Sequence, residues 1–350
     1  MMDKEIYCDA NVIYKAISRT IKSSRRNKRV TQLYQVNQLL YTAKLQKAMR
    51  DETYKPSKGH KFTLRERGKT RLITNNIMVD KVVNHIICDE VLTPRLAKYL
   101  IHDNSASQKN KGVSFHRRRF EERLRRAKNG YVLLGDFAGY YANISHAKAY
   151  ETLAKFLAGY DFTLSLIKMI METFGGDKGI DIGTQISQNI GLIFAYRFDN
   201  YARIVAGIKG YGRYTDDFYA ISSSREELKS LLDGLKTIAA EAGIIINERK
   251  TRIIKLSSFF RYLQHGYSMK GKLIRKINPK TVTRERRKIK AYQRALNDDV
   301  IEEFFKGWIC SNYRRMSHIQ IYNISKLIRR SGTWQKHSRL RYLMDHRLAS

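Results

Sequence analysis

The chain has 350 residues and a formal net charge of +35, from 67 Lys and Arg against 32 Asp and Glu. Such an excess of positive charge is typical of proteins that bind a polyanion, most often nucleic acid. Hydrophobic residues make up 43% of the chain, which is enough for a core and excludes wholesale disorder. The length favours about two domains, or one domain with appended lobes.

The cysteines and the apolar runs bear on the compartment. Cys8, Cys88 and Cys310 are scattered along the chain, and their spacing fits neither a zinc site nor a disulfide framework. The start lacks the apolar stretch of a signal peptide, and no apolar run reaches the ~20 residues of a membrane helix. We therefore expect a cytoplasmic protein without a membrane partner.

The first half of the chain predicts mainly helices around one basic hairpin. A strongly basic segment over residues 22–29 is either a solvated arm or, as we favour, an arm that touches phosphates. The elements that follow are a helix over 39–49, a hairpin over 62–73 that turns at Gly68-Lys69, a helix over 80–92 that Pro94 closes, and a charged helix over 117–128.

The second half mixes strands and helices, which is an α+β pattern. Its predicted elements are a buried strand over 131–134 that ends at Gly135-Asp136, a helix from the cap Ser145 to Leu157, a helix over 186–201, a hairpin with Asp216-Asp217 at its tip, a helix from Ser224 to Gly243, a strand over 244–246, a hairpin over 259–267, and a basic, mostly helical tail from Arg275 with Phe304, Phe305, Trp308 and Ile309 in its core.

Three acidic residues stand out in so basic a chain, because Asp136, Asp216 and Asp217 all lie at the ends of apolar strands. Three carboxylates brought together repel one another and raise their own pKa values. Mg²⁺ relieves that repulsion, prefers oxygen ligands, and needs only one or two carboxylates from the protein. Two such ions roughly 3.5–4 Å apart activate an attacking hydroxyl and stabilise a leaving phosphate oxygen. A lone Asp-Asp turn would be an ordinary turn, but the apolar strands around each acid favour a metal site.

Six segments, in one order, resemble motifs of the reverse transcriptase family. The middle segment, Ile182-Gly183-Thr184-Gln185-Ile186-Ser187-Gln188, resembles the variant found in diversity-generating retroelements, where most of the family has Gln-Gly-x-x-x-Ser-Pro. The other five are residues 68–73 with 80–83, the stretch 105–112, the first palm motif over 136–144, the Tyr214-Thr215-Asp216-Asp217 motif, and Asn247-x-x-Lys250-Thr251. The tail over 273–276 with 304–308 resembles the thumb of the same members, so the resemblance covers about residues 55–325.

The resemblance implies an α+β right-hand polymerase with fingers, palm and thumb, whose antiparallel palm sheet is backed by helices. The N-terminal arm and fingers would take residues 1–128. The palm would take 129–268, with a helical excursion near 147–181, and the basic helical thumb 269–350. The implied activity is RNA-directed DNA synthesis with two Mg²⁺ ions, error-prone at template adenines, in a bacterium or a phage-infected bacterium. The implied partners are template RNA, primer, cDNA, dNTPs and a small basic accessory oligomer.

The resemblance also implies roles for single residues. Asp136, Asp216 and Asp217 would be catalytic and hold the metals, with the backbone carbonyl of Phe137. The dNTP would meet Lys69 and Arg71 at its triphosphate, Tyr141 as a steric gate, and Ile182, Gly183, Gln188 and Lys250. Plain alternatives stay open: Lys69 and Arg71 as an exposed basic hairpin, Tyr141 as a core aromatic, and Lys250 as a surface cation.

Three features of the motifs qualify the implied site. Ile182 replaces a Gln and cannot hydrogen-bond to the nucleotide, which predicts looser selection of the incoming base. Gly183 predicts a close approach of the backbone to that nucleotide. The primer grip, assigned to Leu263 and Gly266, departs from the usual Phe-Leu-Gly-Tyr because its glycine is displaced by two positions.

Three other functions remain open. A retron-like or antiphage-defence reverse transcriptase would differ in genomic neighbourhood. A non-catalytic RNA-binding protein that reuses the palm would not extend a primer. A DNA-templated repair polymerase is disfavoured by the form of the middle motif.

Overall fold

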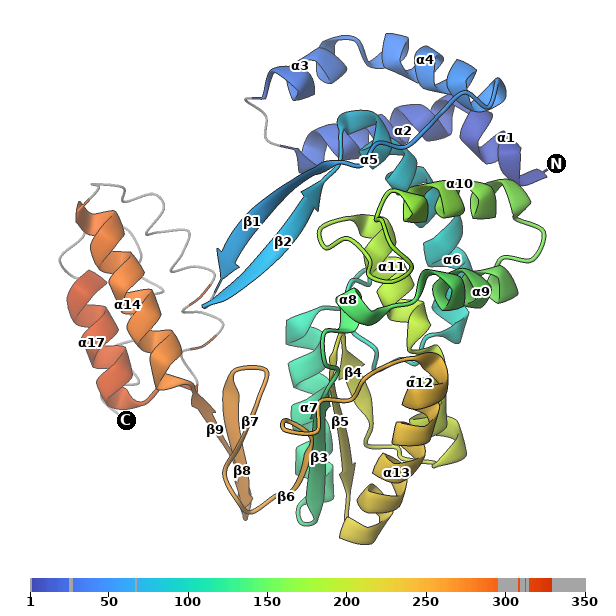
Figure 1. Ribbon diagram of the computed structural model, residues 1–350. Coiled ribbons are helices and arrows are strands. Elements are labelled where there is room, and N and C mark those ends of the chain that lie inside the picture. Colours follow the sequence, from blue (N-terminus) through green and yellow to red (C-terminus); the bar gives the residue numbers. More distant parts are fainter. Residues whose placement is uncertain are drawn as a thin grey trace. The chain divides into compact units, whose positions relative to one another are not determined.

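The computed structural model describes residues 2–24, 28–66, 68–294, 308, 312 and 315–328. Its chain divides into two units, one of residues 1–120 and 133–253 and the other of residues 121–132 and 254–350 (Figure 1). Cys8 and Cys88 are free thiols. Within the described residues, no helix has the length and apolarity to span a membrane. The predictions for residues 25–27, Phe304, Phe305, Ile309 and Cys310 lie outside the described residues.

The first unit begins with helices, of which the sequence predicted only the last. Asp9 caps the second of them, because its carboxylate accepts the backbone N–H groups of Asn11 and Val12. Ile13 and Ile17, one turn apart on that helix, are fully buried. The helices are α1 (Met2–Cys8), α2 (Ala10–Ser23), α3 (Arg29–Val36) and α4 (Gln38–Arg50).

The predicted basic hairpin is confirmed. Strands β1 (His60–Glu66) and β2 (Lys69–Asn75) pair antiparallel, with Phe62 opposite Ile73. Helix α5 (Met78–Ile86) follows and runs through a π-helical turn, Ile87–Leu92, into α6 (Thr93–Leu96) and a 3-10 turn, Ala97–Tyr99.

The prediction that Pro94 closes the helix over 80–92 was wrong. Pro94 lies in the first turn of α6, where the missing N–H of a proline is tolerated.

A four-stranded sheet carries the predicted acids, in the order β4–β5–β3–β6. Strands β4 and β5 pair antiparallel, with Tyr214 opposite Asp217. Gly135 is required in the neighbouring strand, because a Cβ there would overlap the ring of Phe218. The strands are β3 (Tyr131–Asp136), β4 (Gly212–Tyr214), β5 (Asp217–Ser222) and β6 (Arg252–Lys255).

The predicted strand over 244–246 is absent. Only Ile246 bridges to Phe137, because this segment meets the chain just beyond the buried run of β3. The fourth strand, β6, follows a turn later instead.

Helices support the sheet, and α13 lies alongside β5 (Figure 1). As predicted, Ser224 caps α13 and Gly243 ends it in the left-handed conformation, with φ 77°. The helix predicted over 186–201 breaks at Ala195. The helices are α7 (Val113–Ala127), α8 (Tyr140–Asn143), α9 (His146–Phe156, capped by Ser145), α10 (Asp161–Glu172), α11 (Gln185–Phe194), α12 (Tyr196–Asn200) with a π-helical turn over Tyr201–Val205, and α13 (Arg225–Ala242).

The second unit contains a three-stranded antiparallel sheet in the order β7–β8–β9. The predicted hairpin over 259–267 is confirmed by its first two strands. The tail predicted as mostly helical begins in a strand, since Arg275 still belongs to β9. The elements are β7 (Phe260–Tyr262), β8 (His265–Lys270), β9 (Lys272–Ile277), α14 (Pro279–Arg294) and α17 (His318–Ile328).

Candidate active site

The structure brings the three singled-out acids together. Asp136 ends β3, and Asp216 and Asp217 come from the turn between β4 and β5, so adjacent strands of one sheet supply all three. One carboxylate oxygen from each residue lies within 4.8 Å of the other two. Residues 80 positions apart in the sequence thus form one acidic cluster.

A backbone hydrogen bond fixes the position of the Asp216–Asp217 turn relative to the end of β3. The N–H of Phe137 donates to the carbonyl of Asp216 at 3.1 Å, which ties the end of β3 to the turn. The Phe137 ring is buried among Phe198 and Phe218, with ring centroids 5.0 and 5.6 Å away. Thr215, between Tyr214 and Asp216, has φ 57°, a conformation that β-branched residues rarely adopt.

Burial makes the negative charges of this cluster costly. Burial, followed by the charges of Asp216 and Asp136, raises the pKa of Asp217 to about 7. Burial also raises the pKa of Asp216, with Asp136 adding to the effect. Three hard oxygen donors that repel one another in a partly dry site are suited to a divalent cation such as Mg²⁺. The cluster can therefore bind metal.

Lys250 belongs to the same cluster. Its Nζ lies 2.6 Å from Oδ2 of Asp136, and this hydrogen bond is the main reason that the pKa of Lys250 is raised. Asn247 holds Asp136 as well, by donating its backbone N–H to the Asp136 carbonyl at 2.8 Å and its side-chain amide to Oδ2 at 3.3 Å. The ammonium group of Lys250 faces the acids although its side chain is half-exposed, and its role at the nucleotide stays a prediction.

The sequence model of the family described as "Reverse transcriptase (RNA-dependent DNA polymerase)" matches residues 55–270, more than half of the chain. The chain belongs to the reverse transcriptase family. The predicted right-hand polymerase fold with its antiparallel palm sheet is confirmed.

Several solved telomerase structures are similar to this reverse transcriptase. Apo telomerase from Candida tropicalis shares 12% identity at a TM-score of 0.49, covering 84% of this chain and 66% of that chain. Telomerase from Candida albicans in complex with a TWJ fragment of telomeric RNA shares 11% identity at a TM-score of 0.48, covering 85% and 62%. The chain spans about half to two thirds of the length of the telomerases it matches. No curated protein matches it by sequence.

The hairpin of β1 and β2 is hydrogen-bonded to the middle motif, residues 182–188. The N–H of Thr74 on β2 donates to the carbonyl of Ile182 at 2.8 Å. Gly183 has φ 110°, and a Cβ there would lie 2.9 Å from the Thr74 carbonyl oxygen and from a methyl group of Ile73. In the structure Gly183 allows the close approach of the β2 backbone. The close approach of Gly183 to a nucleotide stays a prediction.

The predicted phosphate-binding cations lie on this hairpin. Lys69 and Arg71 are exposed at the start of β2, and the charge of Lys69 lowers the pKa of both Asp216 and Asp217. The side chain of Ile182 is 37% exposed. Their roles at the triphosphate and at the base remain predictions.

Tyr141, the predicted steric gate, lies against Gly191 of α11. A Cβ on Gly191 would approach its hydroxyl oxygen to 3.1 Å, so a glycine makes room for the ring. Burial raises the pKa of Tyr141 to about 12, and Asp216 contributes to the rise. The ring is partly exposed and lies within the electrostatic range of the acids, which suits both the gate and the core interpretation.

A cleft of about 920 Å³ opens beside the middle motif and the base of the hairpin. Gly183 and Gln188 line it together with Phe62, and Lys28 and Lys81 contribute positive charge. None of the described residues that line it carries a carboxylate, so it suits an anionic ligand.

The predicted primer grip lies in the second unit, at the turn between β7 and β8. Leu263 and Gln264 form this turn with φ 42° and 68°. Gly266 allows the ring of Phe259 to cover the strand, since a Cβ there would overlap that ring. The grip function stays a prediction.

Asp199 and Arg213 form a buried ion pair next to the turn that carries Asp216 and Asp217, and this pair was not predicted from the sequence. A signal was present, because both charges occupy positions that the apolar pattern of α12 and β4 assigns to the interior. Periodicity marks such positions but does not reveal which two charges meet.

Proposed function

We propose that this chain is the reverse transcriptase of a diversity-generating retroelement and copies a template RNA into mutagenised cDNA. The observation that carries the polymerase function is the cluster of Asp136, Asp216 and Asp217 within 4.8 Å in a chain of this family. The setting rests on the Ile182-Gly183-x-x-x-Ser187-Gln188 motif. We assign the protein to the cytoplasm of a bacterium or a phage-infected bacterium.

In this proposal the three Asp side chains and the Phe137 carbonyl hold two Mg²⁺ ions. When bound, the ions lower the pKa of the primer 3′-hydroxyl and stabilise the charge that develops on the α-phosphate of the dNTP. Lys69 and Arg71 hold the triphosphate through charge-assisted hydrogen bonds. Lys250, already directed at the cluster, neutralises charge on the departing pyrophosphate.

The remaining residues select the substrate. The Tyr141 ring excludes a ribose 2′-oxygen, and the aliphatic Ile182 leaves the base pair less restrained, which favours errors opposite template adenine. Gln188, Lys28 and Lys81 line the cleft beside the middle motif, and its positive charge favours the approach of template RNA. Leu263 and Gly266 contact the primer, and a small basic accessory oligomer assists.

The decisive experiment is extension of a DNA primer on an RNA template with Mg²⁺ and dNTPs, followed by sequencing of the product. We expect cDNA from the wild type and none from Asp216→Asn. Extension that is indifferent to Asp216→Asn, or absent on every primed template, would refute the polymerase function and favour a non-catalytic RNA-binding protein.

The same products test the setting. We expect misincorporation to concentrate opposite template adenine and to decline in Ile182→Gln, because a glutamine amide restores a hydrogen bond to the nucleotide. An error spectrum that Ile182→Gln leaves unchanged would remove the role of Ile182. A flat spectrum in the wild type would instead favour a retron-like or antiphage-defence enzyme.

A further inference from the structure

A fully buried ion pair lies next to the turn between β4 and β5 that carries Asp216 and Asp217. Arg213, on β4, is 0% exposed, and Asp199, on α12, is 1% exposed. The guanidinium donates from Nε and Nη2 to the two carboxylate oxygens of Asp199, both at 2.8 Å. Buried charges are costly unless every donor finds an acceptor, so the destination of the remaining donors indicates what the pair is for.

One of those donors reaches the turn itself. Nη1 of Arg213 donates to the carbonyl of Thr215 at 2.7 Å, and Nη2 also donates to the carbonyl of Leu192 on α11 at 2.9 Å. Asp199 is held in turn by the hydroxyl of Tyr211 at 2.7 Å. The pair therefore connects the core helices to the residue that precedes Asp216.

Thr215 needs such an anchor. It has φ 57°, which a β-branched residue rarely adopts, in a two-residue turn where glycine or asparagine is usual. The next carbonyl, that of Asp216, accepts the N–H of Phe137. The two peptide groups that carry the acidic side chains are thus each fixed by one hydrogen bond from outside the turn.

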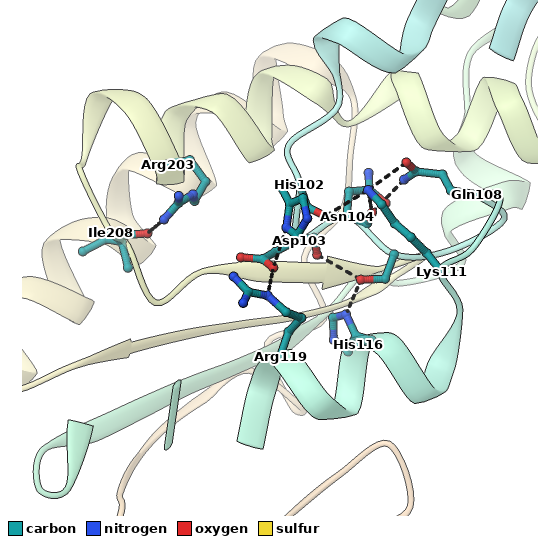
Figure 2. A network of polar contacts seen from close by, with 10 residues as sticks. His102, Asp103, Asn104, Gln108, Lys111, His116, Arg119, Arg203 and Ile208 are labelled. Carbon is teal, nitrogen blue, oxygen red and sulfur yellow. Dashed lines mark hydrogen bonds and ion pairs between the residues drawn. The ribbon is translucent and has the colours of Figure 1, made fainter. Parts of the chain in front are cut away.

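The backbone of Arg213 is fixed as well. Its N–H donates to the carbonyl of Asp103, and its carbonyl accepts the N–H of Ser105, both at 3.2 Å. Figure 2 shows Arg119 and His116 directed at this segment, where Arg119 bonds the Asp103 carboxylate at 2.7 Å and His116 bonds the Ser105 hydroxyl at 3.1 Å. Arg213 cannot slide along the sheet without breaking this network.

We propose that Asp199 and Arg213 are positioning residues, which hold the Thr215–Asp216 turn in its strained conformation so that the acidic cluster can bind metal. The proposal rests on the proposed function only for the identity of the reaction. The geometry that it explains, and the metal binding that tests it, do not depend on that reaction.

The test measures Mn²⁺ binding by electron paramagnetic resonance in the full chain, with no nucleic acid or dNTP present. The double variant Asp199→Leu/Arg213→Met removes both buried charges at similar volume, which folds more often tolerate than the loss of one partner. We expect a native circular dichroism spectrum and at least about tenfold weaker Mn²⁺ binding, with kcat reduced and the KM for dNTP nearly unchanged.

Two further variants separate positioning from mere packing. Arg213→Lys keeps the charge but not the fork that reaches Asp199 and Thr215 together, and it decides the question if the double variant does not fold. Adding Thr215→Gly to the double variant should restore Mn²⁺ binding, because glycine adopts positive φ without an anchor. A loss of packing alone would show no such rescue.

The matched control is Arg197→Met/Glu241→Leu. Arg197 on α12 and Glu241 on α13 also form an Arg–carboxylate ion pair, at 2.7 Å, but both side chains are half-exposed. The hydrogen bond of this pair does not involve the Thr215–Asp216 turn. We expect its Mn²⁺ binding to equal that of the wild type. The proposal is overturned if the double variant or Arg213→Lys folds and binds Mn²⁺ within about twofold of the wild type.

Failure of the two proposals can be told apart. If the wild type binds Mn²⁺ but extends no primer, the proposed function fails while the positioning role is still measured by the binding series. If the wild type extends primers and the Arg213 variants bind Mn²⁺ normally, only the positioning role fails.

Discussion

At the scale of single residues, repulsion within the acidic cluster lowers stability, and the same arrangement of carboxylates allows the cluster to bind metal. Asp217 is half-buried beside Asp216 and Asp136, and burial together with their charges raises its pKa to about 7, which disfavours its ionised form. Strain of this kind is expected at a functional site. Replacing one of these acids should therefore lower activity, because a metal ligand is lost, and raise stability, because the repulsion is relieved.

We predict that Asp217→Asn loses extension by about 1,000-fold or more while its melting temperature in EDTA rises above that of the wild type. The amide keeps the shape of the side chain but carries no charge to bury. Differential scanning fluorimetry and primer extension on one preparation check both effects. A variant that melts lower in EDTA would contradict the account of repulsion.

His116 gives a second prediction, on pH. Burial lowers the pKa of His116 to about 3, with Asp103 opposing the shift and Arg117 adding to it. In the unfolded chain the pKa is about 6.5, so between these values the unfolded state takes up the proton and stability falls as the pH falls. The contribution reaches at most about 1.4 kcal/mol per pH unit.

We therefore expect the urea midpoint of the wild type to drop more between about pH 7 and about pH 5 than that of His116→Asn, which cannot take up this proton. Asparagine retains a polar atom for Ser105, whose hydroxyl lies 3.1 Å from the imidazole. Differences between the two proteins cancel the titration of the carboxylates. Equal pH slopes would show that His116 is protonated without cost.

At the scale of elements, the decisive contact is the one between the β1–β2 hairpin and the middle motif. The hydrogen bond from Thr74 to Ile182 and the close packing at Gly183 make β2 and the start of α11 one structural piece. Lys61 on β1 adds an ion pair with Asp181 at 3.0 Å. The cations on the β1–β2 hairpin are thereby held in a fixed position relative to the middle motif at the start of α11.

We predict that Gly183→Ala destabilises the chain by about 2–3 kcal/mol and loosens β1 and β2, because the new methyl group meets the Thr74 carbonyl and the φ of 110° disfavours any side chain. The control Gly159→Ala has φ 82° and no heavy atom within 4 Å, so it should cost only about 1 kcal/mol. Hydrogen exchange across residues 60–75 checks the loosening. Equal protection in both variants would contradict it.

Elements with a local signal were predictable from the sequence. The β4–β5 hairpin and helix α13 carry alternating or helical apolar patterns and explicit turn or cap residues. Pro94 and residues 244–246 were mispredicted, since a π-helical turn and the end of a partner strand decide their structure.

The same distinction between local signals and tertiary contacts holds for the candidate site. Its acids could be found because each closes an apolar strand. The partnership of Asp199 with Arg213 and the bond from Thr74 to Ile182 depend on tertiary approach, and a backbone hydrogen bond leaves no mark in the residue types.

At the scale of the whole molecule, the net charge of +35 governs association with nucleic acid. Binding of a polyanion releases its counter-ions, so affinity falls with salt, and each phosphate contact on a single strand contributes about 0.7 to the slope of log affinity against log salt. This slope counts contacts in solution, whatever the sequence of the RNA.

We predict that Lys28→Gln/Lys81→Gln reduces that slope by about 1–2 for single-stranded RNA, because both lysines line the cleft beside the middle motif. Lys155→Gln is the control, since Lys155 on α9 is exposed and pairs with Glu151 at 2.8 Å. Fluorescence anisotropy over a salt series measures the slopes. If the double variant and the control gave the same slope as the wild type, RNA would not enter this cleft.

The ion pair between the ammonium group of Lys250 and the carboxylate of Asp136 bears on how the protein folds. The polypeptide supplies its own counter-ion to the first carboxylate, at 2.6 Å, before any inorganic ion is needed. We therefore expect the chain to fold when free Mg²⁺ is scarce, and, under the proposed function, a chelator should remove the metal without unfolding the protein.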